Sequence, residues 1–328
     1  MNIVDSVGST PLIRLKSFSD NFNLYAKLEY MNPWGSLKDR VAVKIIEDAE
    51  EKGLLKEGMH VIEATSGNTG ISMAAVCASK NYKCTVILPE FVSTERKILL
   101  SLLGADIILT KKADGLVGTV AKSLEMAAED ENIFILDQTQ NENNPDSHQA
   151  TAEEMIKQML DENIDVLVVA SGTGGHLSGI GKYLKEHCGT HIIAVEPKSS
   201  AILSGEMSIE EATADHGIIG IGPGFKPKTL DTEVIDEVIV VDEQESYRMA
   251  QKIMKKEGIL IGASSGAALL AAEKLSEQKR FLGKNIIAVL ASSAERYLST
   301  DLAHEARNYV NNLVPQESNL TYINQLLG

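Results

Sequence analysis

A lysine with the potential for covalent chemistry stands in the segment "NPWGSLKDR", residues 32–40. Proline and glycine interrupt the chain there and an apolar helical pattern follows, so we expect Lys38 in the first turn of a helix. Helix N-termini carry partial positive charge, and a cation there forfeits up to about 1 kcal/mol. In one interpretation Ser36 and Asp39 form a capping box and Lys38 points into water. In the other, burial and the helix end depress the pKa of the amine, as imine-forming lysines require.

A second group of polar side chains follows an apolar run, in the turn "EATSGNTGIS". Thr65, Ser66, Asn68 and Thr69 surround Gly67 where a helix of small residues begins. Hydroxyls, an amide and the N–H groups of a helix N-terminus can converge on one carboxylate. The turn therefore predicts a carboxylate-binding loop, with a well-capped turn as the simpler alternative.

A glycine-rich turn, "ASGTGGHLSG", leads from another apolar run into a helix. Its centre consists of Gly172, Thr173, Gly174, Gly175 and His176. Closely spaced glycines let backbone N–H groups approach a phosphate at a helix N-terminus. Nucleotide motifs do not fit, because GxGxxG would need a glycine where the leucine stands and the Walker lysine followed by Ser or Thr is absent. A structural turn remains the alternative.

A pair of serines ends the last apolar run, in "AVLASSAERYLST". Ser292 and Ser293 are most simply interpreted as helix caps. Together, however, a lysine, a carboxylate loop, a phosphate loop and a terminal hydroxyl suit pyridoxal phosphate. Its aldehyde forms an imine with lysine, its phosphate needs N–H donors and its ring nitrogen needs one partner. We therefore expect a pyridoxal-phosphate site.

Strands and helices alternate along the chain and would position these loops. Apolar runs predict strands at residues 60–64, 84–89, 105–110, 133–137, 166–170, 192–196, 238–241 and 286–290. Helical patterns lie at residues 94–103, 118–129, 150–160, 178–187, 243–256 and 265–278. Continuous apolar strands indicate burial on both faces, so we expect an α/β fold with open, mainly parallel sheets. Ligands bind beyond the carboxyl ends of such strands, where all three turns lie.

Composition excludes several classes of function. Acidic residues number 46 against 31 basic ones, which gives a formal net charge of −15, and no basic run occurs. Nucleic acid and anionic membranes are therefore not expected as partners. The start resembles no signal peptide, and no stretch of about 18 apolar residues occurs. Three cysteines without CxxC spacing indicate reduced thiols and no zinc site, so we expect a cytoplasmic protein without a metal.

Over nearly its whole length, the chain resembles the cysteine synthase (O-acetylserine sulfhydrylase) and cystathionine β-synthase family. These are pyridoxal-phosphate enzymes of fold type II. The resemblance rests on motifs in the family's order and spacing, namely "GSTPLIRL", "NPWGSLKDR", "EATSGNTGISMA", "STERK", "VEP", "GIGPGF", "GASSGAA" and "SSAERYLST". It implies two open, mainly parallel twisted sheets flanked by helices, a tryptophan synthase β-subunit-like fold, and a homodimer.

The resemblance also implies a role for each residue of the site. Lys38 is the imine lysine and the catalytic residue, Asn68 bonds the ring oxygen of the cofactor and Ser293 faces its pyridine nitrogen. The phosphate is bound by Gly172, Thr173, Gly174, Gly175 and His176. The carboxylate of a small amino-acid substrate is bound by Thr65, Ser66, Gly67, Thr69 and Gln138.

Length and the resemblance together suggest two domains around a cleft. We expect a smaller, mobile domain at residues 35–145, joined by residues 1–10, and a larger domain at 146–328, joined by residues 11–34. The polar tract at 138–148 is the candidate crossing between them. The segment after about residue 313 loses its periodicity and is expected to be a loosely held tail.

The expected reaction is β-replacement through an aminoacrylate, with O-acetyl-L-serine and sulfide giving L-cysteine and acetate. Departures from the family pattern leave other partners open: His176 replaces a threonine, Trp34 is large beside Lys38, Ala291 and Ala294 replace proline and glycine, and "HQATAEE" stands where "TTGPE" is common. The alternatives are homocysteine, a second cysteine giving lanthionine and hydrogen sulfide, or an amine nucleophile. Deamination of serine or threonine, or a cofactor-silent binding protein, is less consistent with the motifs.

His176 is the departure with a direct electrostatic consequence. If its imidazole faces the phosphate, its pKa should rise, and cofactor retention should weaken as the pH climbs past that value. In the alternative the ring turns away and fills space beneath the helix, and the N–H groups of the loop bind the phosphate.

Overall fold

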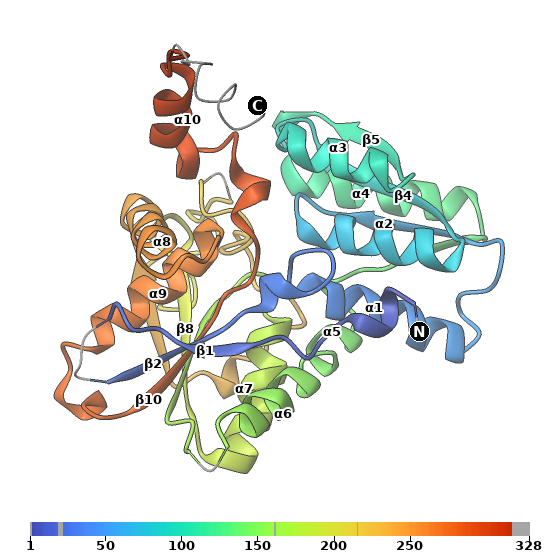
Figure 1. Cartoon of the computed structure of the whole chain (residues 1–328). Helices are drawn as coiled ribbons and strands as arrows, with labels where there is room; N and C mark the ends of the chain where they lie inside the picture. The colour runs from blue at the N-terminus through green and yellow to red at the C-terminus, as the bar shows by residue number, and fades with distance from the viewer. Residues whose placement is uncertain (1, 19–21, 161, 215, 317–328) are drawn as a thin grey trace, which may run out of the picture.

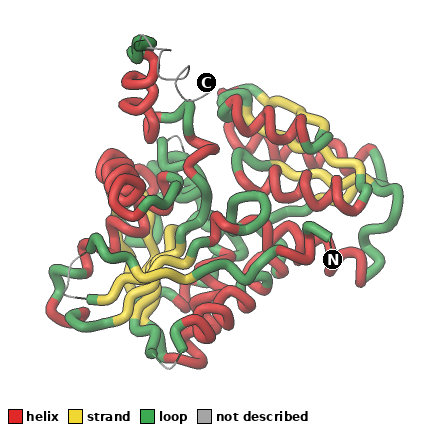
Figure 2. Tube along the Cα trace, viewed as in Figure 1, coloured by secondary structure: helices red, strands yellow, loops and turns green. Residues whose placement is uncertain are grey.

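The computed structural model describes residues 2–18, 22–160, 162–214 and 216–316 of the chain, and these form two sheets with helices around each (Figure 1). A six-stranded and a four-stranded sheet lie side by side, and helices separate and cover them (Figure 2). The predicted α/β class, with two open and mainly parallel sheets flanked by helices, is confirmed.

The larger sheet combines strands from the N-terminal and the C-terminal parts of the chain. Its strand order is β1-β2-β10-β7-β8-β9, and only the β1–β2 pair is antiparallel. The strands are β1 (Leu12–Arg14), β2 (Asn23–Lys27), β7 (Val166–Ala170), β8 (His191–Pro197), β9 (Glu237–Val241) and β10 (Asn285–Val289).

Helices cover both faces of the larger sheet. Helices α8 (Glu243–Glu257) and α9 (Ala263–Leu275) pack on one face, and α6 (Gln149–Gln158) and α7 (Gly175–Cys188) pack on the other. Along β7, Val168 belongs to the first core and Leu167 to the second, because successive side chains of a strand point to opposite faces.

The smaller sheet is entirely parallel, with the order β5-β4-β3-β6. Its strands are β3 (His60–Ala64), β4 (Lys83–Pro89), β5 (Asp106–Thr110) and β6 (Ile133–Ile135). Its helices are α1 (Lys38–Glu51), α2 (Asn68–Lys80), α3 (Thr94–Leu102) and α4 (Gly115–Glu129). Helices α1 and α2 pack on one another, whereas α4 contacts all four strands. The polar tract that follows β6 leads through α5 (Asn143–Asp146) to α6, beside the larger sheet (Figure 1).

All eight predicted strands are present, with ends shifted by up to two residues. The sequence did not predict β1 and β2, because β1 has three residues and β2 alternates polar with apolar side chains instead of forming an apolar run. Predicted helices 118–129 and 178–187 begin three residues earlier, since the glycines before them are helical. Helix α10 (His304–Asn311) stands away from both sheets in Figure 1, and the tail predicted after residue 313 lies mostly outside the described residues.

Among the described residues, no helix is long and apolar enough to cross a membrane. Within the same residues, no cluster of three or more His, Cys, Asp or Glu side chains could hold a metal ion. Cys77 and Cys84 are buried free thiols in the core of the smaller sheet, and Cys188 is exposed. The domain boundaries remain a prediction.

Candidate active site

Lys38 is the first residue of α1, as the sequence predicts. Its amide N–H donates to Ser36 Oγ at 3.2 Å, and the Asp39 carboxylate accepts the N–H of Trp34 at 2.8 Å. Both predicted capping residues therefore stabilise the helix start, although the Asp39 carboxylate accepts the Trp34 N–H and the Ser36 hydroxyl, the latter at 3.4 Å, and not the Ser36 backbone N–H. Trp34 is partly buried and packs against the core of the smaller sheet.

The partly buried Lys38 amine is directed at the glycine loop. Its Nζ donates a hydrogen bond to Thr173 Oγ1 at 3.1 Å. Burial lowers its pKa to about 8, while the nearby Glu63 carboxylate acts in the opposite direction. A fraction of the amine is therefore unprotonated near neutral pH, which a nucleophile or proton acceptor requires.

The glycine loop between β7 and α7 presents a row of free backbone donors. Within the described part of the chain, the N–H groups of residues 172–176 donate no hydrogen bond. Gly174 has a φ of +84°, and a Cβ on Gly172 would lie 2.1 Å from the Gly220 carbonyl oxygen. Only glycine fits either position. Five successive free N–H groups at a helix N-terminus form an anion site suited to a phosphate.

The turn between β3 and α2 forms a second group of donors. The Gly67 N–H donates to Thr65 Oγ1 at 3.1 Å and shapes the turn. The N–H groups of Ser66, Asn68 and Thr69 have no acceptor among the described residues. This arrangement suits a carboxylate at the N-terminus of α2.

Gln138, which the family resemblance placed in the site, does reach this turn. Its Nε2 donates to Thr65 Oγ1 at 3.3 Å, and its Oε1 accepts the hydroxyl of Thr69. The backbone N–H groups of Asp137 and Gln138 donate to the buried Glu63 carboxylate at 2.8 and 3.4 Å. Burial raises the pKa of Glu63 to about 8. The two hydrogen bonds to Glu63 anchor the segment that carries Gln138, and the sequence did not reveal this role of Glu63.

Asn144 of α5 connects the two loops and was also missed. Its Nδ2 donates to the Gln138 carbonyl at 2.6 Å and to Thr173 Oγ1 at 3.1 Å. A continuous path of hydrogen bonds thus runs from Gln138 through Asn144 and Thr173 to Lys38. The only signal in the sequence was the density of amides in "QTQNENNPDSH", which we interpreted as a domain crossing.

Two serines are candidates for the role predicted for Ser293, which is to face the pyridine nitrogen of the cofactor. The Ser293 hydroxyl donates to Glu295 Oε2 at 2.9 Å and accepts the Glu295 N–H at 3.4 Å, which is the capping alternative considered above. Ser293 pairs with Ile261, next to the start of α9. In the first turn of α9, the buried Ser264 hydroxyl makes no hydrogen bond within the described residues. Ser264 lies in the motif "GASSGAA", for which the sequence alone suggested no role in the site.

Asn68 is the first residue of α2, in the predicted smaller domain, but its side chain contacts the predicted larger domain. Its Oδ1 accepts a hydrogen bond from Arg296 Nη1 at 2.6 Å. Arg296 belongs to the short helix η7 (Ala294–Tyr297), which follows the Ser292–Ser293 pair. The two segments are 228 residues apart in sequence.

His176 lies beneath the loop and contacts a second buried histidine. The ring centroids of His176 and His148 are 5.8 Å apart, edge to face. Burial and the charge of Lys38 lower the pKa of His176 to about 3, while a hydrogen bond to the backbone of Ala170 opposes them. Its Nδ1 has no partner among the described residues. This placement matches the alternative in which the ring fills space, although its contact with a phosphate stays a prediction.

The arrangement fits pyridoxal phosphate. Five free N–H groups match the phosphate, and an amine of lowered pKa lies 3.1 Å from the same loop. A serine hydroxyl is present for the ring nitrogen, and a second set of donors at α2 matches a substrate carboxylate.

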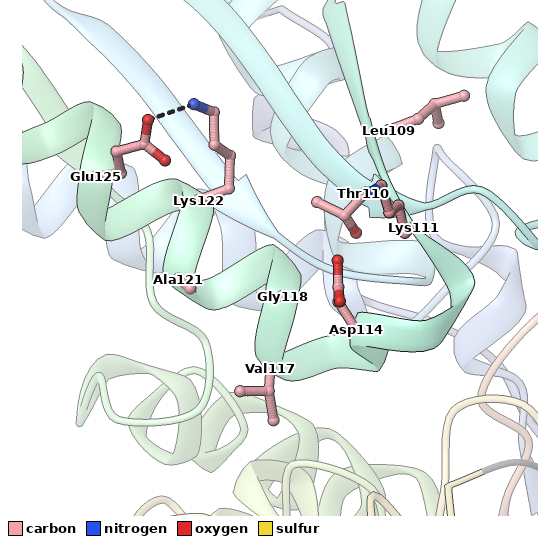
Figure 3. Close-up of a pocket in the computed structure, with 9 residues that line it drawn as sticks. All are labelled: Leu109, Thr110, Lys111, Asp114, Val117, Gly118, Ala121, Lys122 and Glu125. Atoms are coloured by element: carbon pink, nitrogen blue, oxygen red, sulfur yellow. Dashed lines mark hydrogen bonds and ion pairs between the residues drawn. The ribbon is translucent and has the colours of Figure 1, made fainter.

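A surface groove between β5 and α4 has no part in this arrangement (Figure 3). Lys122 and Glu125 form an ion pair of 2.7 Å on one of its walls. Its lining residues, none of them predicted for the site, are Leu109, Thr110, Lys111, Asp114, Val117, Gly118, Ala121, Lys122 and Glu125.

Comparison with known proteins identifies the family to which a chain with this fold and site belongs. Residues 3–292 match the model of a family described as pyridoxal-phosphate dependent enzyme, and the chain belongs to this family. It is 44% identical over 312 residues to a cysteine synthase of Buchnera aphidicola, covering 94% of this chain and 97% of that protein.

Solved structures give the same result. The cysteine synthase (OASS) of Entamoeba histolytica superposes with a TM-score of 0.87 and 37% identity, over 97% of this chain and 92% of that one. An O-ureido-L-serine synthase superposes with a TM-score of 0.87 and 32% identity, over 98% of both chains. The chain is thus an enzyme that uses pyridoxal phosphate, with the fold type II architecture implied by its motifs.

Proposed function

We propose that this enzyme is a cysteine synthase, which replaces the acetoxy group of O-acetyl-L-serine by sulfide and forms L-cysteine and acetate. The similarity to curated and solved cysteine synthases supports this reaction. The observation that carries it is the position of the Lys38 amine, 3.1 Å from Thr173 in a loop with five free N–H donors.

When bound, pyridoxal phosphate supplies an aldehyde for Lys38 and an electron-withdrawing ring that makes the substrate Cα–H acidic. Lys38 Nζ, with its pKa lowered to about 8, accepts the proton from Cα and later returns it. Free N–H groups of residues 172–176 hold the phosphate. Asn68, whose Oδ1 accepts from Arg296, would donate its N–H to the ring oxygen.

The substrate carboxylate is held at the N-terminus of α2. Thr65, Ser66 and Gln138 would supply side-chain hydrogen bonds, and the N–H groups at the helix start, with Gly67 shaping the turn, would supply the rest. The Thr69 hydroxyl donates to Gln138 Oε1, so Thr69 would contribute its backbone N–H and orient the Gln138 amide. A serine hydroxyl, from Ser293 or Ser264, donates one neutral hydrogen bond to the ring nitrogen and adds no negative charge there.

A second candidate is the same β-replacement with another donor or nucleophile. It is supported by the bulky Trp34, whose backbone N–H donates to Asp39, the residue after Lys38, and by the likeness to an O-ureido-L-serine synthase. A bulky residue there would change which nucleophile enters. The candidates remain homocysteine, a second cysteine or an amine.

The wider organisation is also a proposal. We propose a homodimer in the cytoplasm, in which the smaller domain, residues 35–145 with 1–10, moves against residues 146–328 with 11–34. The path of hydrogen bonds from Gln138 to Lys38 supports a link between the movements of the two domains. It runs from Gln138 and Asn144 of the smaller domain to Thr173 of the larger domain and back to Lys38 of the smaller one.

The test combines a spectrum with a product assay. Visible absorption of the purified protein, followed by borohydride reduction and peptide mapping, shows whether pyridoxal phosphate is attached to Lys38. Incubation with O-acetyl-L-serine and sulfide, homocysteine, cysteine or amines then identifies the nucleophile. Cysteine formed fastest with sulfide supports the leading proposal. Attachment at Lys38 with a faster product from another nucleophile favours the second candidate.

A further inference from the structure

Arg296 contacts the predicted ligand of the cofactor's ring oxygen from the other part of the molecule. Its Nη1 donates to Asn68 Oδ1 at 2.6 Å. A guanidinium group can only donate hydrogen bonds, so the carboxamide of Asn68 must turn its oxygen toward Arg296. The NH₂ group of Asn68 is then the donor end of the amide, and the ambiguity of an amide flip is removed. One of its two N–H groups faces the Tyr297 hydroxyl, which leaves the other for a ligand.

The same guanidinium also lies on the loop that leads to Lys38. A Cβ built on Gly35 would lie 3.1 Å from Arg296 Nη2 and 3.6 Å from its Cζ. Gly35 has a φ of +77°, and its carbonyl accepts the Ser293 N–H at 3.2 Å. Arg296 therefore touches both the loop before Lys38 and the start of α2.

The charge of Arg296 has no ion-pair partner in the described part of the chain. The side chain is 5% exposed, and burial lowers its pKa while Asp39 opposes that shift. A second buried cation, Arg96, lies over the ring of Tyr297, 4.9 Å from its centroid. Burying a guanidinium without a paired carboxylate is costly, so stability alone does not account for this placement.

We propose that Arg296 is a positioning residue that fixes and polarises the Asn68 carboxamide, so that the amide presents an N–H donor to the ring oxygen of pyridoxal phosphate. Hydrogen bonds in series polarise one another, so a charged donor at Oδ1 makes the N–H groups of the same amide better donors. This inference rests on the proposed function, which places the ring beside Asn68.

A double-mutant cycle tests whether Arg296 acts through Asn68. The variants are Arg296→Met, Asn68→Ala and the double variant, with Arg280→Met as a matched control, because Arg280 is exposed and pairs with Glu237 of β9. The readouts are the dissociation constant of pyridoxal phosphate and the absorption maximum of the bound form. Each single variant should weaken retention roughly tenfold, and the double variant should be no weaker than Asn68→Ala alone.

A second variant keeps the test valid if Arg296→Met unfolds. In Asn68→Asp the carboxylate can pair with Arg296 but cannot donate to the ring oxygen. The cofactor-free variant should unfold at a higher temperature than the wild type, while its retention of pyridoxal phosphate falls as in Asn68→Ala. Arg296→Lys, which keeps a cationic donor, should restore part of the retention lost in Arg296→Met.

The outcomes separate this inference from the proposed function. Multiplicative losses in the double variant, or an Asn68→Asp protein that retains the cofactor normally, would overturn the role of Arg296. A wild-type protein that does not bind pyridoxal phosphate at Lys38 would overturn the proposed function itself.

Discussion

Lys38 Nζ and Thr173 Oγ1 are joined by a hydrogen bond of 3.1 Å, although Lys38 begins a helix beside the smaller sheet and Thr173 lies in a loop that follows a strand of the larger sheet. The helix N-termini of α1 and α7 thus bring an amine and an anion site together. Neither feature alone specifies a cofactor, whereas the two together suit a cofactor that carries both an aldehyde and a phosphate.

Replacing Lys38 by alanine should abolish the covalent attachment of pyridoxal phosphate and turnover together. The reason is that, in the proposed site, this amine both attaches the cofactor and transfers the Cα proton. Borohydride reduction and peptide mapping measure the attachment, and Lys44→Ala, an exposed lysine of the same helix, is the control. A label on another lysine in the wild type would contradict the assignment.

Removing Ser66 or Gln138 side-chain donors should weaken substrate binding but leave the cofactor spectrum intact. Each hydrogen bond to a charged carboxylate is worth roughly 1.5 to 3 kcal/mol, which corresponds to a loss of about 10- to 150-fold in affinity. Titration of Ser66→Ala and Gln138→Ala with O-acetyl-L-serine measures it, with Gln140→Ala, an exposed neighbour, as the control. Unchanged titration in both variants would argue against this carboxylate site.

Replacing each of the two serines near the start of α9 should change the absorption of the bound cofactor to a different extent. Ser293 already donates to Glu295, whereas the Ser264 hydroxyl is free within the described residues. Ser264→Ala should therefore shift the absorption of the bound cofactor more than Ser293→Ala, which should mainly destabilise the turn after β10. The opposite ranking would return the role to Ser293.

His176 should make stability depend on pH between about 6.5 and 3. Burial lowers its pKa in the folded protein to about 3, below its ordinary value of 6.5, so the folded state binds fewer protons than the unfolded state. Its contribution is therefore complete above pH 6.5 and is lost as the pH falls, by at most about 1.4 kcal/mol per unit.

The measurement is denaturant unfolding of the cofactor-free protein at pH 7 and pH 5. His176→Thr should lose less stability than the wild type over this interval. His148 is buried beside it, with a pKa also well below the ordinary value, and is unchanged in both proteins, so its contribution cancels to first order. Equal losses in the two proteins would show that His176 is not held neutral by burial.

The sequence predicted the parts of the candidate site that lie within a single short segment of the chain. The position of Lys38 follows from chain breaks and a cap, and the two turns proposed to bind phosphate and carboxylate follow from glycines between strands and helices. The bridging role of Asn144 could not be predicted, because it depends on how α5 lies between two loops from different sheets. The Arg296–Asn68 contact joins residues 228 positions apart and has no local signal.

The pairing of β2 with β10 has a consequence for how the chain folds. Asn23 and Asn285 lie in register although 262 residues separate them, whereas every strand of the four-stranded sheet falls between residues 60 and 135. On a ribosome the smaller sheet can assemble as soon as that contiguous stretch has emerged. The larger sheet must wait for residue 289, and closing so long a loop is slow. During synthesis, β2 therefore remains without its parallel neighbour β10 for most of the translation time, and its unpaired edge is open to pairing with other chains during that interval.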